Sequence, residues 1–347
     1  INIYQVFTRL FRNDDGKNTK FGSISENEVS KFNHFDTKAL ESIRSMGITH
    51  IWFTGVIRHA TCTSYKDSGI DDCSPAIVKG VAGSPYAITD YYDVNPDLSE
   101  DVSKRMSEFE NLIKRTHKNN LKVIIDFVPN HVAREYKSIC KPKSVKDLGA
   151  TDNVLKQFDP QNNFYYLPYL TFEQPDGISF PYTKKAKPYK EYPAKATGND
   201  AFTAKPSIND WYETVKLNYG VDIMNGRRGH FNPIPDTWIK MRDILLFWAK
   251  KHVDAFRCDM AEMVPVEFWE WAIAEVKQQH PNIIFIAEVY NPVEYHNYLF
   301  RGGFDFLYDK VGLYDIVRSV TQQHAGAYEF GNFWRNRDNT LNPHMLR

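Results

Sequence analysis

The chain contains 347 residues, and its 43 lysines and arginines are balanced by 43 aspartates and glutamates. A formal net charge of zero provides no overall field that would attract nucleic acid or an anionic membrane, so the expected partner is an uncharged molecule. No stretch of about 18 consecutive apolar residues is present, and the sequence therefore predicts no membrane span. Nothing in the composition indicates an oligomeric state.

The first seven residues read as a β-strand and not as a charged and then apolar signal peptide, which indicates a mature or trimmed start. Four cysteines in a chain of this length do not form a disulfide scaffold, although Cys62 and Cys73 flank one polar loop and could pair in a secreted protein. These features favour an extracytoplasmic location (secreted, periplasmic or cell-surface), and the redox compartment stays open.

Strand-like runs alternate with amphipathic segments of helical length in the first third of the chain. Residues 2–7 and 48–54 are predicted to be strands because they are rich in β-branched and aromatic side chains. Between them, a helix is predicted to begin after Asp36, a suitable N-cap, and to stop at Gly47. Its apolar residues recur at helical spacing.

A second helix over residues 103–118 leads into a third strand over residues 121–127, which is nearly all apolar, as a strand covered on both faces should be. The alternation then breaks down over residues 132–235, which are rich in Pro, Tyr, Lys and Asn. An unstructured loop of that length inside a compact domain is uncommon, so we interpret it as a subdomain inserted between residues 1–131 and residues 236–347.

Regular alternation returns after Asp236, which is predicted to cap the next helix. The elements expected after that helix are a strand ending at Asp259, a helix over residues 266–279, strands over residues 282–288 and 304–308, a helix over residues 313–323 and the start of a further strand at residues 345–347. Alternating strands and helices of these lengths predict an α/β fold with a parallel sheet. Six and a fraction such units do not close a barrel.

Two predicted strands end in carboxylates. Because side chains alternate along a strand, Arg257 and Asp259 share one face, and the guanidinium favours an ionised carboxylate suited to nucleophilic attack. Glu288 follows an apolar run, and apolar surroundings favour the protonated form that a general acid needs. Adjacent barrel strands would hold the two groups roughly 5 Å apart, which predicts glycoside cleavage with net retention.

Each of these residues also has an ordinary structural interpretation when it is taken alone. The Arg257 and Asp259 pair could be a simple ion pair, Asp126 a helix cap, His131 a satisfied polar core residue and Glu288 a solvated strand end. Their order along the chain and their shared position at strand ends favour a catalytic site.

Three segments, residues 126–131, 255–259 and 285–288, make the chain resemble the α-amylase superfamily, glycoside hydrolase family 13. The resemblance extends from the first strand to the last residues. It implies a (β/α)8 barrel with a subdomain inserted after strand three, at the place of the irregular region. The family's fourth segment ends in His-Asp, and no His-Asp dipeptide follows Glu288. We therefore expect an incomplete barrel, truncated before its last two units, and a fragment of a longer enzyme.

Residue by residue, the resemblance implies a role for each matching position. It assigns Asp259 as nucleophile, Glu288 as acid/base, Arg257 as the orienter of the nucleophile, Asp126 and His131 as contacts in the central sugar subsite, and Tyr86 as a stacking residue. It also implies that Glu262 and Met263 lie near the subsites that accept the leaving sugar.

The resemblance raises the question of calcium, although no cofactor is required for the chemistry. Many relatives bind Ca²⁺ between barrel and insertion through an Asn that matches Asn130 and a late acidic residue, which Lys216 replaces here. A cation at that position would repel Ca²⁺. Residues 13–16 could form a different calcium loop, but a polar turn is the preferred interpretation.

The leading hypothesis is a retaining hydrolase of α-glucans such as starch or maltooligosaccharides that works through a glycosyl-Asp259 intermediate. The first alternative is an α-glucan transglycosylase with the same site, and the second is an inactive amylase-like module that binds glucan. A metal-dependent hydrolase that uses Asp126, His131, Asp259 and Glu288 is disfavoured, because the sequence lacks paired His spacing and Arg257 would oppose a cation.

Overall fold

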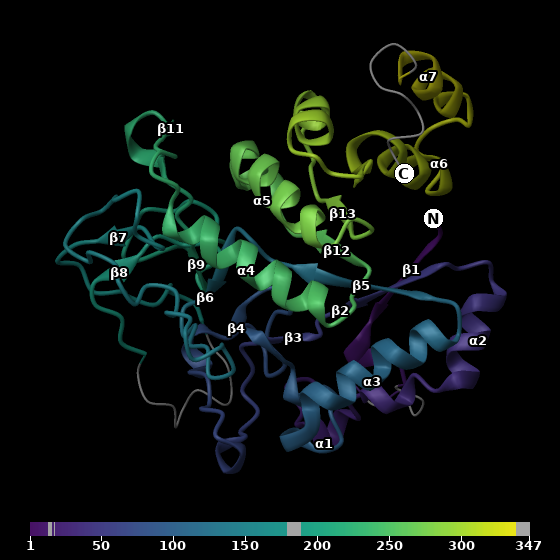
Figure 1. Ribbon diagram of the computed structural model, residues 1–347, viewed down its shortest axis with the longest axis horizontal. Helices are drawn as coiled ribbons and strands as arrows, with labels where there is room; N and C mark the ends of the chain where they lie inside the picture. Colours follow the sequence, from purple (N-terminus) through teal and green to yellow (C-terminus); the bar gives the residue numbers. More distant parts are fainter. Residues whose placement is uncertain (13–15, 17, 179–188, 338–347) are drawn as a thin grey trace.

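The computed structural model describes residues 1–12, 16, 18–178 and 189–337, and within them the chain forms an incomplete (β/α)8 barrel (Figure 1). All pairings in its main sheet are parallel. The strands follow one another in the order β1 (Ile3–Phe7), β2 (His50–Thr54), β5 (Lys122–Phe127), β12 (Ala255–Cys258), β13 (Ile284–Ala287) and β14 (Phe306–Leu307). Strands that are neighbours in this sheet therefore follow one another in chain order.

Helices connect the strands and cover one side of the sheet. They are α1 (Ile24–Asn27), α2 (Thr37–Ser45), α3 (Arg105–Lys118), α4 (Asp236–Lys250), α5 (Val266–Gln279), α6 (Asp315–Thr321) and α7 (Tyr328–Arg337). The α3 and α4 helices meet through Phe109 and Trp248, whose rings are fully buried and lie edge to face at 5.9 Å. Aromatic packing of this kind holds neighbouring helices against the sheet.

The helix predictions are confirmed with small shifts at the ends. The Asp36 carboxylate caps α2 by accepting a hydrogen bond from the Ala39 nitrogen, as predicted. The Asp236 prediction is wrong, because Pro235 occupies the N-cap of α4 and Asp236 is its first helical residue. The Asp236 carboxylate instead pairs with Lys240, 2.7 Å away. The helix expected over residues 313–323 is divided into a π-helical turn, Lys310–Tyr314, and α6.

Several predicted features fall outside the described residues. These are the start of a seventh strand at residues 345–347 and most of the polar turn at residues 13–16. Among the described residues, no helix combines the length and the apolar character needed to cross a membrane.

Short antiparallel pairs lie outside the main sheet. The pair β3 (Ile57–His59) and β4 (Ile88–Val94) follows β2, and the sequence analysis did not predict it. Between β5 and α4, the paired strands are β6 (His131–Ala133) with β9 (Thr214–Lys216), β7 (Tyr166–Leu167) with β8 (Ala194–Lys195), and β10 (Val221–Asp222) with β11 (Arg228–Gly229). In Figure 1 this teal region extends from one end of the molecule. The proposed boundaries of an inserted subdomain at residues 132 and 235 stay a prediction.

The outer strands of the main sheet leave the barrel open along one side. Over the described residues, β1 and β14 each pair on one side only. A cavity of about 670 Å³ lies between them, and Ile3, Trp52, Ile286 and Phe306 contribute to its lining. Apolar side chains of the inner face are therefore accessible along this opening, together with Arg257, which also borders the cavity.

Candidate active site

The carboxylates singled out from the sequence meet at the C-terminal ends of three adjacent strands. Asp126 lies in β5, while Asp259 and Glu288 directly follow β12 and β13. Arg257 stands opposite Asp126 in the register of β12 with β5. All four side chains lie in residues that are only 4–7% exposed. The C-terminal end of the strands is where barrel enzymes carry their chemistry.

Strand alternation places the charged groups on the inner side. Phe256 and Cys258 pack in the core with the helices, while Arg257 and Asp259 border a cavity of about 390 Å³, and Arg257 also borders the cavity between β1 and β14. Glu288, Tyr86 and other polar groups border the same cavity. Arg257 and Asp259 therefore lie in one site, as the sequence predicted.

One guanidinium connects the three acids. Arg257 places Nη1 2.7 Å from Oδ1 of Asp259 and Nη2 2.7 Å from Oε1 of Glu288. Its Nη1 also lies 3.4 Å from Oδ1 of Asp126, and its Nε donates to the Tyr308 hydroxyl at 2.9 Å. Because the two terminal nitrogens of a guanidinium are about 2.3 Å apart, the bonded oxygens of Asp259 and Glu288 are less than about 8 Å apart.

Glu288 has polar partners that the sequence analysis missed. Its Oε2 accepts a hydrogen bond from the main-chain nitrogen of Met260 at 2.8 Å, and its Oε1 accepts one from the Tyr290 hydroxyl. The prediction of purely apolar surroundings is therefore wrong for the carboxylate itself, because Arg257 also contacts it. Tyr290 could have been found from its position, since it lies two residues after Glu288 and such residues share a face of an extended strand.

Burial dominates the acidity of both aspartates. It raises the pKa of the Asp126 carboxyl to about 6, and the Arg257 charge and the indole N–H of Trp52 act in the opposite direction. Burial also raises the pKa of Asp259, while Arg257 lowers it and the charge of Glu288 raises it further. Arg257 thus favours the ionised form of Asp259, as predicted, while desolvation of the carboxylate gives the pKa its net upward direction.

Tyr86 and His131 border the same cavity as Asp259 and Glu288, together with Trp211. The Tyr86 ring centroid lies 5.5 Å from the guanidinium carbon of Arg257. Burial, with the charge of Lys216, lowers the pKa of His131 to about 3, so its imidazole is neutral at physiological pH. Trp211 packs against His131 at 5.2 Å, and no sequence signal distinguished it from the other aromatic residues of the region.

Residues 5–301 match the family model described as "Alpha amylase, catalytic domain". The chain belongs to the α-amylase family. Alpha-amylase 3 of Dictyoglomus thermophilum is 25% identical over 345 residues, which cover 96% of this chain and 52% of that protein. An alpha-1,4-glucan:maltose-1-phosphate maltosyltransferase of Cereibacter sphaeroides is 34% identical over 135 residues, which cover 36% of this chain and 22% of that protein. The chain thus spans about half or less of the length of these relatives.

Solved structures of α-amylases share the fold. The α-amylase of Lactobacillus plantarum superposes with a TM-score of 0.59 at 20% identity, over 99% of this chain and 60% of that chain. An Anoxybacillus α-amylase gives a TM-score of 0.61 at 18% identity, with the same two coverages of 99% and 60%. At these identities the likeness establishes the architecture and not the substrate.

In this α-amylase-family chain, the place where the resemblance implies calcium contains an ammonium group. Lys216 donates to Oδ1 of Asn130, and its Nζ lies 2.7 Å from Oδ1 of Asp200. The main-chain oxygen of Met263 lies 3.3 Å from the same nitrogen. The oxygens at this place therefore surround a buried ammonium group.

Glu262 lies just after the nucleophile segment, but its carboxylate is already used for structure. Its Oε2 accepts hydrogen bonds from the main-chain nitrogens of Tyr290 and Asn291, each at 3.0 Å. Glu262 thus fixes the backbone beyond Glu288. A role in accepting the leaving sugar stays a prediction.

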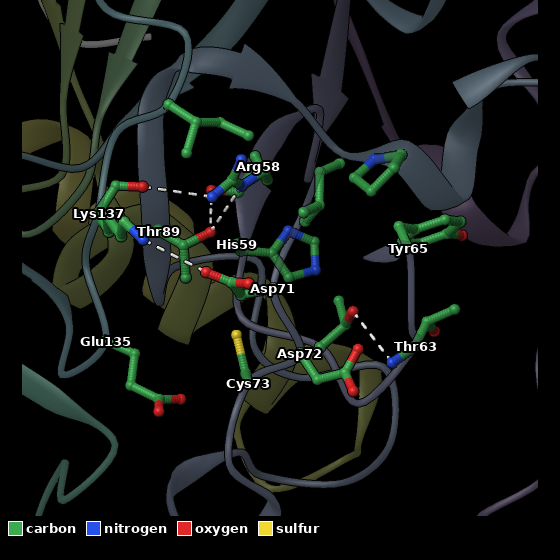
Figure 2. A pocket seen from close by; sticks show the side chains of 14 residues that line it. Arg58, His59, Thr63, Tyr65, Asp71, Asp72, Cys73, Thr89, Glu135 and Lys137 are labelled. Atoms are coloured by element: carbon green, nitrogen blue, oxygen red, sulfur yellow. Dashed lines mark hydrogen bonds and ion pairs between the residues drawn. The ribbon is translucent and has the colours of Figure 1, made fainter. Parts of the chain in front are cut away.

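A third cavity, of about 170 Å³, lies in the loops around β3 (Figure 2). Its arginine, Arg58, is held by Asp93 at 3.3 Å and by the main-chain oxygen of Lys137 at 3.3 Å, while the Lys137 ammonium pairs with Asp71 at 3.3 Å. Cys73 contributes to the lining, and both it and Cys62 are free thiols, so the pairing that the sequence allowed is not present. The carboxylates attributed to sugar chemistry lie elsewhere.

Proposed function

We propose that this chain carries the nucleophile and the acid/base of a retaining enzyme that acts on α-linked glucans such as starch or maltooligosaccharides. The observation that carries the proposal is the single guanidinium of Arg257, which contacts Asp259 and Glu288 at neighbouring strand ends. Membership of the α-amylase family supports the α-glucan substrate class. Tyr86 and Trp211 give the cavity apolar ring faces of the kind that pack on sugar rings.

The proposed reaction has two steps. Ionised Asp259 attacks the anomeric carbon, and the bond to the leaving sugar breaks as Glu288 transfers its proton to the glycosidic oxygen. Glu288, now a carboxylate, then takes a proton from water, whose oxygen bonds to the anomeric carbon as the bond to Asp259 breaks. Two inversions give net retention.

The strand geometry favours retention over inversion. Adjacent parallel strands lie about 4.8 Å apart, which suits the separation of about 5–5.5 Å in retaining enzymes better than the 6.5–9.5 Å of inverting ones. Protonated Glu288 cannot form an ion pair, so its 2.7 Å contact with Arg257 has to open or become a neutral hydrogen bond when the sugar binds. The bound sugar then has access to the proton.

A transglycosylase is the second candidate, and one observation favours it. Relatives with 34% identity over 135 residues are named maltosyltransferases. Transfer uses the same residues, with a sugar hydroxyl in place of water in the second step. Product analysis separates the two: free reducing sugar indicates hydrolysis, and lengthened oligosaccharides indicate transfer.

The decisive experiment compares Glu288→Gln and Asp259→Asn with the unchanged protein on maltooligosaccharides. Each variant is expected to lose at least about a thousandfold in kcat, since general acid catalysis alone contributes roughly 10²–10⁴. Glu275→Gln is the matched control, because Glu275 lies outside the site and contacts Arg242. An unchanged rate in the Glu288 variant contradicts the proposal, and glucan binding without turnover in the unchanged protein supports the inactive-module alternative.

A further inference from the structure

We propose that the ammonium group of Lys216 does the structural work of a bound calcium ion and, through Asn130, holds His131 as an Nε2–H donor at the sugar cavity. The first half concerns the folded chain alone. The second half rests on the proposed function only where it states that the Nε2–H group of His131 donates to a bound sugar. Its experiments can therefore fail or succeed separately from glucan hydrolysis.

Lys216 joins three separate parts of the chain. Its own strand, β9, pairs with β6, and Lys216 stands opposite His131 in the register. The three oxygens that it contacts come from Asn130 after β5, from Asp200 in the region between β8 and β9, and from Met263 after β12. The ammonium group donates hydrogen bonds to Asn130 and Met263 and forms an ion pair with Asp200. This convergence is the kind of cross-link that a structural cation provides.

The acid in this cluster is already neutralised by positive groups and does not attract a second cation. Asp200 is the one carboxylate among the three ligands of Lys216 named above, and its other oxygen, Oδ2, lies 3.1 Å from Nη2 of Arg227. Both oxygens of this acid therefore face positive groups. Ca²⁺ takes 6–8 oxygen ligands at 2.3–2.6 Å and is favoured by unneutralised acids, and this cluster offers neither.

The same contacts determine how Asn130 is oriented. Lys216 can only donate, so the group of Asn130 that faces it must be the carbonyl oxygen. The amide Nδ2 of Asn130 then faces the Gly198 carbonyl at 2.8 Å and Nδ1 of His131 at 3.1 Å. Because an amide nitrogen donates, Nδ1 of His131 must accept.

That acceptor role fixes the tautomer of the histidine. A neutral imidazole with an unprotonated Nδ1 carries its proton on Nε2. His131 borders the cavity of Asp259 and Glu288, where the main chain of Tyr86 and an incoming sugar hydroxyl are the two acceptors for this proton. Lys216 is thus a positioning residue that acts through Asn130.

Thermal unfolding with and without calcium tests the first half. The melting temperature of the unchanged protein is expected to be the same in EGTA and in millimolar CaCl₂. Lys216→Asp, which returns a carboxylate to the position, is expected to melt lower in EGTA and to regain several degrees with CaCl₂. A calcium-dependent rise in the unchanged protein overturns the proposal, as does a folded Lys216→Asp variant that shows no response to calcium.

Calorimetric titration of the unchanged protein with CaCl₂ keeps the test valid if Lys216→Asp does not fold. No saturable binding is expected. A 1:1 isotherm that disappears in Asn130→Ala would place calcium at this site and overturn the proposal.

The second half is tested by ¹⁵N NMR of histidine-labelled protein. The His131 resonances are expected to report protonation at Nε2 in the unchanged protein and a mixture of tautomers in Asn130→Ala and Lys216→Met. Lys216→Arg, which keeps the cation, is expected to restore the Nε2 form. A proton on Nδ1 in the unchanged protein contradicts the relay, whatever its activity on glucan.

Discussion

The indole nitrogen of Trp52 donates a hydrogen bond to Oδ2 of Asp126, 3.1 Å away, inside the barrel. Trp52 belongs to β2, so the strand next to β5 orients a carboxylate that the sequence analysis assigned to the sugar site. Arg257 contacts the other oxygen of Asp126. In a buried environment, Asp126 thus has the indole of Trp52 and the main chain of Gly55 as neutral partners and Arg257 as a charged one.

Trp52→Phe removes the indole donor and puts a smaller aromatic ring in its place. Its expected cost is about 1–3 kcal/mol of unfolding free energy, the desolvation penalty of a buried acceptor that loses its partner. Urea denaturation at pH 7 measures it. Trp334→Phe, at an exposed position in α7, is the control and is expected to stay within about 0.5 kcal/mol. Equal effects of both substitutions would contradict this role of Trp52.

Arg257→Gln leaves three buried carboxylates without their common cation. We expect a loss of about 3–5 kcal/mol in unfolding free energy at pH 7, because uncompensated buried charge is costly. Arg242→Gln, which breaks a half-exposed pair with Glu275, is expected to cost less than about 1 kcal/mol. Chemical denaturation measures the unfolding free energy of both variants. A similar loss in the two would contradict the role of Arg257 as the common cation.

Protonation of His131 opposes folding at acid pH. Its pKa is lowered from 6.5 to about 3 in the folded chain, so between these values the unfolded chain binds a proton that the folded chain does not. The contribution of His131 to the unfolding free energy is fully present above pH 6.5 and is lost as the pH falls toward 3. Asp126 acts with the opposite sign, because its pKa is raised to about 6 and folding favours its protonated form below that pH.

His131→Gln is therefore expected to flatten the pH dependence of stability. The difference in unfolding free energy between pH 7 and pH 5 should shrink by up to about 2 kcal/mol relative to the unchanged protein. Guanidinium denaturation at the two pH values provides the measurement. His324→Gln, at an exposed position, should leave the difference as it is. An undiminished difference in the His131 variant would show that this imidazole does not titrate as described.

Two glycines in the loop that leads to Tyr86 provide a matched pair. Gly80 and Gly83 both have positive φ, +78° and +69°. A Cβ at Gly80 would meet nothing within 4 Å, whereas a Cβ at Gly83 would lie 1.7 Å from the main-chain oxygen of Ala60. The two positions therefore share backbone strain and differ in available space.

Gly80→Ala is expected to cost about 1–2 kcal/mol through backbone strain alone. Gly83→Ala is expected to cost a further 1–3 kcal/mol from overpacking, and to lower kcat/KM by displacing the segment that carries Tyr86. Thermal unfolding and glucan kinetics of the two variants test this. Equal melting temperatures would mean that the loop moves freely at Gly83 and does not brace Tyr86.

Local signals were sufficient for many of the helices and strands. The bounds of α5, Val266–Gln279, agree with the sequence prediction because apolar spacing and flanking residues act within the helix itself. The β3–β4 pair was missed because Ile57 and Val94 meet across 36 intervening residues, and no local pattern encodes such a partner. Asp236 was misassigned as a cap because Asn163 and Lys240 compete for its carboxylate, and Asn163 lies far away in the sequence.

In the candidate site, too, some residues could be predicted from sequence motifs and others could not. Motif order along the chain brought Asp126, Asp259 and Glu288 together in the prediction, and the fold places them around Arg257. Tyr308 and the Met260 nitrogen contact the same groups, yet each looks ordinary in the sequence. Every non-proline residue has a main-chain N–H group, so the sequence does not mark the one of Met260. Met260 contacts Glu288 because it adopts a left-handed conformation, with φ +44°.

The open side of the barrel has a consequence for how the polypeptide behaves in solution. Over the described residues, the outer edges of β1 and β14 keep main-chain donors and acceptors available, and Ile1 and Ile3 are both 41% exposed beside them. Unprotected strand edges beside apolar side chains recruit further strands, including those of identical molecules. Self-association that grows with concentration is therefore expected. Sedimentation measurements should establish the oligomeric state at the concentration at which rate constants are measured.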